Sequence, residues 1–290
     1  MVTFYQTVNR FLEQNEQAML ANESASCLVL GNARAERDKL CVPERMFGNV
    51  LDGAGNILLI FCNYYPFNLC VYAHTPDREL QMKAAAELAH TLTEESPFLF
   101  NGLTANRTVC DAFFESYRAP DEAPVFLAAS MDIMELTELS PINLSPGFQR
   151  EAEEADLPLL TRWNQEFEGE ALKAERSRED AEKSVRRAMK SGFYLYCGAD
   201  GQPVSCAVTA RRMENTVTLN HVYTPPAFRG KGYAQSNVYL VCKRALESGY
   251  QKCSLFVDQL NPISNRVYEK IGFRVTEDQY DYRFKRRKPD

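Results

Sequence analysis

One stretch of the chain, residues 217–248, constrains the fold more than any other. Residues 217–223 alternate apolar and polar side chains and are rich in β-forming residues, so they predict a strand. A short turn with Gly230 and Gly232 follows, and a helical pattern then continues until Gly249 ends it. This succession predicts an anion site, because the first turn of a helix has free N–H groups and its dipole favours negative charge.

The residues of the turn narrow the kind of anion site. Gly230 and Gly232 let the backbone approach a ligand closely, and Arg229 and Lys231 add positive charge. A P-loop would need Ser or Thr after the lysine, where this chain has Gly232. A Rossmann fingerprint would need a third small residue at the position that Gln235 occupies. The sequence therefore excludes both nucleotide motifs.

The same turn fits the pattern R/Q-x-x-G-x-G/A. This pattern is the pyrophosphate-binding signature of the GNAT N-acetyltransferase superfamily, which the chain resembles over about its last half. The resemblance implies that the pyrophosphate of acetyl-coenzyme A lies on this turn. It assigns cofactor contacts to these residues of the strand, the turn and the helix start: Val222, Tyr223, Thr224, Arg229, Gly230, Lys231, Gly232, Tyr233 and Ala234.

A second part of the resemblance lies downstream, where a β-rich run is followed by Asn261, Asn265, Tyr268 and the pair Gly272-Phe273. In the family, an asparagine near this point bonds the pantetheine arm, so the resemblance assigns Asn261 and Asn265 to the cofactor. A tyrosine on the following helix sits near the thioester sulfur, and Tyr268 has that place. Because Asn265 and Tyr268 are three residues apart, we expect them on one helix face.

The reaction that the resemblance implies is direct attack of an amine on the acetyl thioester. The family supplies backbone N–H groups to the carbonyl oxygen around Val222 to Thr224, which stabilises the developing charge. Tyr268 is the candidate general acid for the departing thiolate, because a phenol stays protonated at neutral pH. The alternative is that Tyr268 is a core tyrosine packed beside Gly272-Phe273.

The general base is left open between several residues. A neutral imidazole would suit a base, and His221 lies on the signature strand, where alternation places it on the same side as Tyr223. A strand histidine is as often a packing residue. Carboxylates are the other candidates, and those at the end of the first helix of this half could instead attract a cationic amine or be a solvated helix end. The carboxylate candidates are Glu214, Glu166, Glu168 and Glu170.

Composition and charge exclude some classes of partner. The 290 residues are 45% hydrophobic and 25% charged, as in a globular protein with a real core. A formal net charge of -6 argues against nucleic acid as a main partner, and the basic run at 285–288 is typical of a solvated tail. The nine cysteines include no C-x-x-C pair and the three histidines are far apart, so we expect no metal site.

The sequence predicts a cytoplasmic protein with no membrane partner. The longest apolar stretch, residues 56–73, is interrupted by Asn63, Pro66 and Asn68, so it predicts two strands instead of a membrane span. The first twenty residues lack the continuous apolar region of a signal peptide. Cysteines within strand-like runs are expected to be small buried hydrophobes in a reducing compartment.

The predicted fold class is α+β, with mixed α/β elements in two domains, 1–145 and 146–290. A turn-rich stretch at 139–147 suits a boundary. The C-terminal domain has the strand and helix order of a GNAT fold. In the N-terminal domain we expect a helix at 4–21, a short strand at 26–30, further strands and two more helices. This order permits a degenerate second GNAT-like unit or an unrelated α+β domain.

The turn at 73–80 of the N-terminal half has no glycine and carries acidic residues where pyrophosphate would sit. If this half is GNAT-like, we expect it not to bind coenzyme A in the usual way. The function that the resemblance implies is an acetyl-coenzyme A-dependent N-acetyltransferase acting on a small-molecule or peptide amine. A non-catalytic acyl-coenzyme A sensor or interaction protein on the same scaffold is the alternative. The acceptor, the acyl chain length and the oligomeric state are left open.

Overall fold

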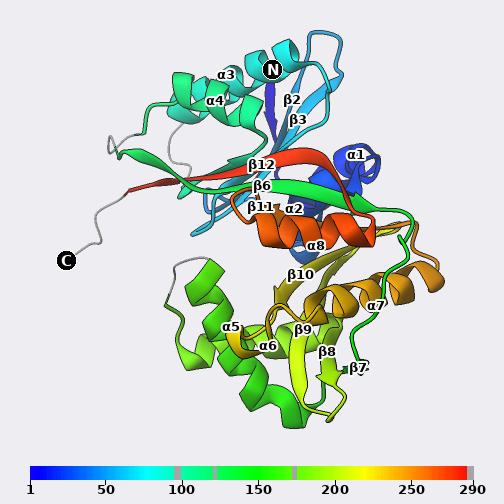
Figure 1. Ribbon diagram of the computed structural model, residues 1–290. Helices are drawn as coiled ribbons and strands as arrows, with labels where there is room; N and C mark the ends of the chain where they lie inside the picture. The colour runs from blue at the N-terminus through cyan, green and yellow to red at the C-terminus, as the bar shows by residue number, and fades with distance from the viewer. Residues whose placement is uncertain (95–98, 120–122, 172–174, 286–290) are drawn as a thin grey trace. The chain divides into compact units, whose positions relative to one another are not determined.

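The computed structural model describes residues 1–94, 99–119, 123–171 and 175–285 (Figure 1). Residues 286–288 of the basic run lie outside the described residues. The chain forms two compact units, described one at a time below. The first comprises Met1–Ile133, Asp258–Leu260 and Thr276–Asp290, and the second comprises Met134–Val257 and Asn261–Val275. These units divide the chain differently from the domains 1–145 and 146–290, which stay a prediction.

The second unit is a sheet with helices on both faces. Its strands are β7 (Gly147–Glu151), β8 (Phe193–Gly198), β9 (Pro203–Arg212), β10 (Thr216–Tyr223) and β11 (Lys252–Asp258). They lie in the order β11-β10-β9-β8-β7, in which β10 and β11 are parallel and the other neighbours antiparallel. Its helices are α5 (Leu157–Ala171), α6 (Arg178–Ser191), α7 (Tyr233–Glu247) and α8 (Pro262–Ile271), with short 3-10 turns η1 (Glu154–Asp156) and η2 (Pro226–Phe228).

Strand alternation divides the core of the second unit between the two faces of the sheet. On β8, Phe193 and Leu195 join a cluster with α5 and α6, whereas Tyr194 between them joins a cluster with α7 and α8. Leu160 and Trp163, three residues apart on α5, are buried in the first of these clusters, as their helical spacing predicts. The sheet therefore holds α5 and α7 on opposite sides of β10.

The first unit has the same kind of sheet. Its strands are β1 (Val2–Phe4), β2 (Arg45–Leu51), β3 (Ile57–Tyr64), β4 (Leu69–Ala73) and β5 (Gly102–Ala105). Its helices are α1 (Val8–Leu20), α2 (Glu23–Ala35), α3 (Arg78–Glu94) and α4 (Arg107–Ser116). The strands pair in the order β1-β2-β3-β4-β5, and only β4 and β5 among these pairs are parallel. Two further strands, β6 (Val125–Leu136) and β12 (Arg274–Phe284), have residues in both units.

The two units repeat one order of elements. Each has a strand, two helices, three strands, a helix, a strand, a helix and a final strand. The parallel pair, β4 with β5 and β10 with β11, occupies the same place in both orders. The repetition favours the prediction that the N-terminal half has the layout of the C-terminal half over the alternative of an unrelated domain.

The C-terminal strand completes the sheet of the first unit. β12 pairs antiparallel with β5, from Tyr280 opposite Ala105 to Arg283 opposite Gly102. Tyr280 and Phe284 are 7% and 8% exposed and belong to the core cluster formed with α3 and α4. Residues from the two ends of the chain therefore share one hydrophobic core.

Two expectations about the first unit are wrong. The helix expected at 4–21 begins only at Val8, with Thr7 as its N-cap, and Phe4 lies in β1. Residues 26–30 predict a strand from their β-rich composition, but they lie in α2. The Asn22 side chain accepts a hydrogen bond from Ala25 N and so starts a helix there. Cys27, Leu30 and Ala33 are then buried at helical spacing, on a helix that contacts β3 and β4. Tertiary packing overrides the local β propensity.

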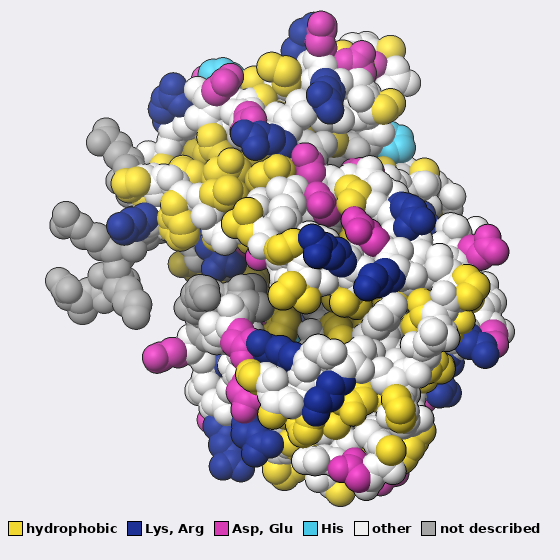
Figure 2. Space-filling model, in the orientation of Figure 1, with side chains coloured by type: hydrophobic (Ala, Val, Ile, Leu, Met, Phe, Trp, Pro, Cys, Tyr) yellow, Lys and Arg dark blue, Asp and Glu magenta, His cyan; other side chains and the backbone are white. Residues whose placement is uncertain are grey.

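Charges of both signs are interspersed over the visible face of the molecule (Figure 2). Among the described helices, none combines the length and the apolarity that a membrane crossing needs. Five cysteines lie in runs that the sequence predicts as strands: Cys62, Cys70, Cys197, Cys206 and Cys253. All are buried except Cys70, which is half-buried. No pair of cysteines within the described ranges forms a disulfide.

Candidate functional site

The signature strand β10 separates from its parallel neighbour near its end. The two strands stop pairing at Leu219 and Leu255, although β10 continues to Tyr223. A shift in the register of β10 with β9 follows, and His221 has a φ of 50° in the left-handed region. A bulge of this kind bends a strand and re-aims its groups. The backbone at Val222 therefore lies where the parallel ladder has opened.

The turn after β10 presents the N-terminus of α7. Gly230 and Gly232 have φ angles of 76° and 75°, which glycine adopts without strain. Gly232 is the N-cap, and no side chain caps the helix. In the described part of the chain, no protein group accepts a hydrogen bond from the N–H of Tyr233 or Ala234. Free N–H groups at the positive end of a helix dipole can bind an anion.

A hydrogen-bond network ties this turn to the end of α5. Arg229 Nη2 lies 2.5 Å from Oε2 of Glu170, and Arg229 Nε donates to the Thr224 carbonyl at 2.8 Å. The same guanidinium stands 5.8 Å from the centre of the Tyr223 ring. The Tyr223 hydroxyl lies 3.0 Å from Oε2 of Glu166 and 3.3 Å from Oε1 of Glu170. Burial and the hydrogen bond to Glu166 raise the pKa of this phenol.

The three glutamates at the end of α5 therefore have partners. Glu168 pairs with Arg176 at 2.5 Å, and Glu166 also lies 3.7 Å from Arg162. Glu170 pairs with Arg229 at 2.5 Å. The sequence predicts that these carboxylates attract a cationic amine or that they are solvated. The structure shows that positive charge of the chain itself already offsets them.

His221 lies among aromatic rings. Its ring centre is 4.5 Å from that of Phe167 and 5.9 Å from that of Phe193. Tyr223 also contacts Phe167, at 6.3 Å, so the two side chains share one side of β10 as predicted. Burial, and then the charge of Arg176, lower the pKa of His221 from 6.5 to about 4. The imidazole is therefore neutral at pH 7 but is a weak base, and its role as general base stays a prediction.

The downstream site residues lie on α8. Asn261 is the N-cap of this helix, and its side chain accepts a hydrogen bond from Ser264 N at 3.1 Å. Asn265 is half-buried, and Tyr268 is only 8% exposed, with its ring 5.9 Å from that of Phe273. Burial raises the pKa of the Tyr268 phenol. Since a thiolate is a weaker base than such a phenolate, Tyr268 can hydrogen-bond a leaving thiolate more readily than it can protonate it fully.

The first unit closes the corresponding helix N-terminus with its own side chains. Helix α3 follows β4, and Asp77 Oδ1 accepts hydrogen bonds from Glu79 N at 2.9 Å and from Leu80 N at 3.2 Å. Nearby, the side chain of Asn106 donates to that of Gln81 at 3.1 Å. A bound anion would meet a carboxylate at this place. This geometry agrees with the prediction that the first unit does not bind coenzyme A in the usual way.

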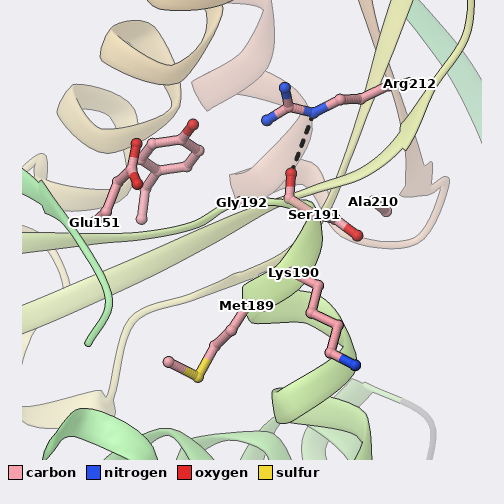
Figure 3. A pocket seen from close by; sticks show the side chains of 8 residues that line it. Glu151, Met189, Lys190, Ser191, Gly192, Ala210 and Arg212 are labelled. Atoms are coloured by element: carbon pink, nitrogen blue, oxygen red, sulfur yellow. Dashed lines mark hydrogen bonds between the residues drawn. The ribbon is translucent and has the colours of Figure 1, made fainter. Parts of the chain in front are cut away.

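Two cavities lie in the second unit. One, of about 400 Å³, is next to the end of α6, where Arg212 Nε donates to the Ser191 carbonyl at 3.1 Å, with Glu151 across from them (Figure 3). Positive charge at a helix C-terminus is favourable, so Arg212 has a structural role there. The other, of about 330 Å³, shares Glu166 with the network above and is lined mainly by α5, by the start of β9 and by η2 with the proline before it.

All predicted site residues lie in the second unit. Arg229 donates directly to the Thr224 carbonyl and is linked to Tyr223 through Glu170 of α5. Asn265 and Tyr268 lie on α8, and Asn261 is its N-cap. Sequence reasoning missed one neighbour of the turn, Ser145, which it placed in a linker, because a lone serine in a turn-rich stretch carries no signal. The described residues hold no group of three or more His, Cys, Asp or Glu side chains suited to a metal ion.

Comparisons with known proteins concern the family and the fold of the chain. The sequence profile of the acetyltransferase (GNAT) family matches residues 157–273. Uncharacterized N-acetyltransferases of Mycobacterium bovis and Mycobacterium tuberculosis are 32% identical over 76 residues, or 26% of this chain. The chain spans about half the length of these curated relatives, 49%.

Solved structures extend the likeness in fold to both units. A GNAT-family acetyltransferase from Colwellia psychrerythraea has a TM-score of 0.61 at 13% identity, covering 98% of this chain and 100% of that one. A GCN5-related N-acetyltransferase from Sphaerobacter thermophilus has a TM-score of 0.57 at 16% identity, covering 90% and 86%. At such identities the likeness concerns the fold alone. The profile match, independently of these structures, identifies residues 157–273 as a domain of the acetyltransferase (GNAT) family.

Proposed function

We propose that the second unit transfers an acetyl group from acetyl-coenzyme A to a primary amine by direct attack. The observation that carries the proposal is the uncapped N-terminus of α7, behind two glycines at positive φ, beside a strand that has left its parallel partner. The uncapped helix start behind the glycines suits a pyrophosphate, and the backbone of the opened strand suits a thioester carbonyl. Family membership of residues 157–273 supports the same reaction.

The turn offers space and charge for the pyrophosphate. A Cβ added at Gly230 would meet no heavy atom within 4 Å, so this side of the turn is open. Lys231 is exposed beside it. Successive N–H groups around residues in the left-handed region form a concavity that binds anions. Arg229 would contribute mainly by holding Thr224 and Glu170, since its guanidinium already bonds both.

In the proposed reaction a bond forms between the amine nitrogen and the acetyl carbon, and the carbon–sulfur bond breaks. Backbone N–H groups near Val222 would stabilise the oxyanion. The leaving thiolate would receive a hydrogen bond from Tyr268. The proton lost by the amine would go to His221 or to a carboxylate such as Glu166, and the pH dependence of turnover separates an imidazole from a carboxylate.

Calorimetric titration of acetyl-coenzyme A tests the proposal. We expect about one site per chain in the wild type, lost in Gly232→Glu. Gly249→Glu is the matched control, because Gly249 also has a positive φ, 102°, and follows the other end of the same helix. Two sites per chain would mean that the first unit binds as well. No binding by the wild type would refute the proposal.

Thiol release with a panel of amines then tests turnover. Release of free coenzyme A that depends on an amine, with acetylated amine found by mass spectrometry, is the expected result. Binding without turnover for any amine would instead support the acyl-coenzyme A sensor. The cytoplasmic location and the absence of nucleic-acid and membrane partners are further expectations that separate fractionation and binding assays can check.

A further inference from the structure

Ser145 is bonded to the signature turn through both its side chain and its backbone. Its hydroxyl donates to the Lys231 carbonyl at 2.7 Å, and its N–H donates to Ser236 Oγ at 2.9 Å. Its own carbonyl accepts a hydrogen bond from Tyr196 Oη at 2.5 Å. Ser236 is 1% exposed on the first turn of α7, and its hydroxyl in turn donates to the Gly232 carbonyl at 3.1 Å. The segment before β7 is therefore fastened across the start of α7.

These bonds fix the orientation of two peptide groups. In a planar trans peptide the N–H points opposite to the C=O. Holding the Lys231 carbonyl toward Ser145 therefore directs the N–H of Gly232 to the opposite side. Holding the Gly232 carbonyl toward Ser236, through both its N–H at 3.0 Å and its hydroxyl, does the same for the N–H of Tyr233. The two serines thus hold the carbonyls of Lys231 and Gly232 toward themselves, and the N–H groups of Gly232 and Tyr233 point away from them.

Ser145 also sets the space at Gly232. A Cβ added at Gly232 would lie 2.8 Å from Ser145 Oγ, closer than real Cβ contacts come. Two features therefore favour glycine at this position: its φ of 75° and the Ser145 hydroxyl packed against it. By contrast, a Cβ at Gly230 would meet nothing, so the close contact is confined to the side that carries Ser145.

We propose that Ser145 is a positioning residue of the donor site, whose hydroxyl keeps the amides of Gly232 and Tyr233 directed at the pyrophosphate. The inference rests on the proposed function and adds to it a residue outside the family-profile match at 157–273. It acts through the turn and touches no reacting atom. Its loss should therefore weaken binding of the pyrophosphate part of the donor and leave the chemistry at the thioester unchanged.

The test compares Ser145→Ala with a matched control, Ser248→Ala. Ser248 Oγ donates to the Ala245 carbonyl at 2.8 Å, so the control removes a similar hydrogen bond from the other end of α7. Since one hydrogen bond of this kind changes an equilibrium about threefold to tenfold, Ser145→Ala should raise the Kd of coenzyme A by that factor. Ser248→Ala should leave the Kd unchanged.

A truncated donor separates positioning from a general structural effect. For S-acetyl-N-acetylcysteamine, which has no pyrophosphate, kcat/KM should be the same in Ser145→Ala as in the wild type. The Ser145→Ala change should also relieve part of the defect of Gly232→Ala, because it removes the atom that the new Cβ meets. Three results would each overturn the proposal. The first is an equal fall in activity with the truncated donor and with acetyl-coenzyme A, and the second is an unchanged Kd for coenzyme A in Ser145→Ala. The third is that the effects of Ser145→Ala and Gly232→Ala simply add in the double variant.

Binding of inorganic pyrophosphate tests the role of Ser145 without assuming which acyl donor the protein uses. If the wild type binds pyrophosphate but not coenzyme A, the proposed acetyltransferase function is refuted. Ser145→Ala should in that case still raise the Kd of pyrophosphate. If the wild type binds neither, the site holds no such anion and the role of Ser145 is overturned with it. Retention of the wild-type melting temperature in both serine variants is the expected control.

Discussion

The pairing of β12 with β5 predicts that a residue near the C-terminus stabilises the unit that begins at the N-terminus. Phe284 is 8% exposed, and its ring centre lies 5.8 Å from that of Phe100, 5.9 Å from that of Tyr117 and 6.1 Å from that of Phe114. Removing a buried phenylalanine side chain costs about 3–5 kcal/mol. Because Phe284 ends its strand and its surroundings can relax, we expect Phe284→Ala to cost about 3 kcal/mol.

Urea unfolding followed by two probes measures this effect. The only tryptophan, Trp163, is 2% exposed in the core of the second unit, so its fluorescence reports that unit, whereas far-ultraviolet circular dichroism reports both. Phe284→Ala should shift the dichroism transition to lower urea. Phe67→Ala is the matched control, since Phe67 is 65% exposed and its loss should cost less than about 0.5 kcal/mol. Equal curves for the two variants would refute the assignment of β12 to the core of the first unit.

Three further predictions concern single residues. Tyr268→Phe should lower kcat about 10-fold to 100-fold, as expected for loss of a hydrogen bond to a charged leaving thiolate, and leave the Kd of acetyl-coenzyme A unchanged; equal kcat would remove the hydrogen-bonding role. Burial lowers the pKa of His221 from 6.5 to about 4, so the unfolded chain takes up a proton first as the pH falls. The free energy of unfolding should therefore fall as the pH drops from 6.5 toward 4. In His221→Gln, urea unfolding at several pH values should show a smaller fall over this range. A fall as large as in the wild type would contradict the lowered pKa of His221. Asp77→Ala should destabilise the first unit by about 1 kcal/mol through loss of the α3 cap, yet calorimetry should find no second coenzyme A site.

The parts of the site that a sequence can predict are those made by backbone and by fixed spacing. The glycines of the turn, the start of α7 and the place of Tyr268 on α8 follow from residue type and distance along the chain. The structure has each of them where the pattern puts it. Such features depend on local conformation, which a run of a few residues determines.

Features made by contacts distant in the sequence could not be predicted. Arg229 and Glu170 are 59 residues apart, and Ser145 and Lys231 are 86 apart. Nothing in the sequence near Glu170 distinguishes an ion-paired carboxylate from a solvated one. The partner of β5 is equally remote, because β12 begins 169 residues after β5 ends, at Arg274 and Ala105 respectively. The helix α2 shows the same limit, since its packing on β3 and β4 outweighs the local β propensity of residues 26–30.

The two units together show why fold and site must be argued separately. Their cores use the same order of elements, because burying both faces of a sheet requires only apolar periodicity. Anion binding depends on a few N–H groups at one helix end, and there the units differ: Asp77 occupies these groups on α3, whereas Gly232 leaves them open on α7. A carboxylate at that position satisfies the helix and at the same time repels a phosphate. A carboxylate at the N-cap can therefore exclude an anion without disturbing the fold, so the shared topology alone does not decide whether a unit can bind a phosphate.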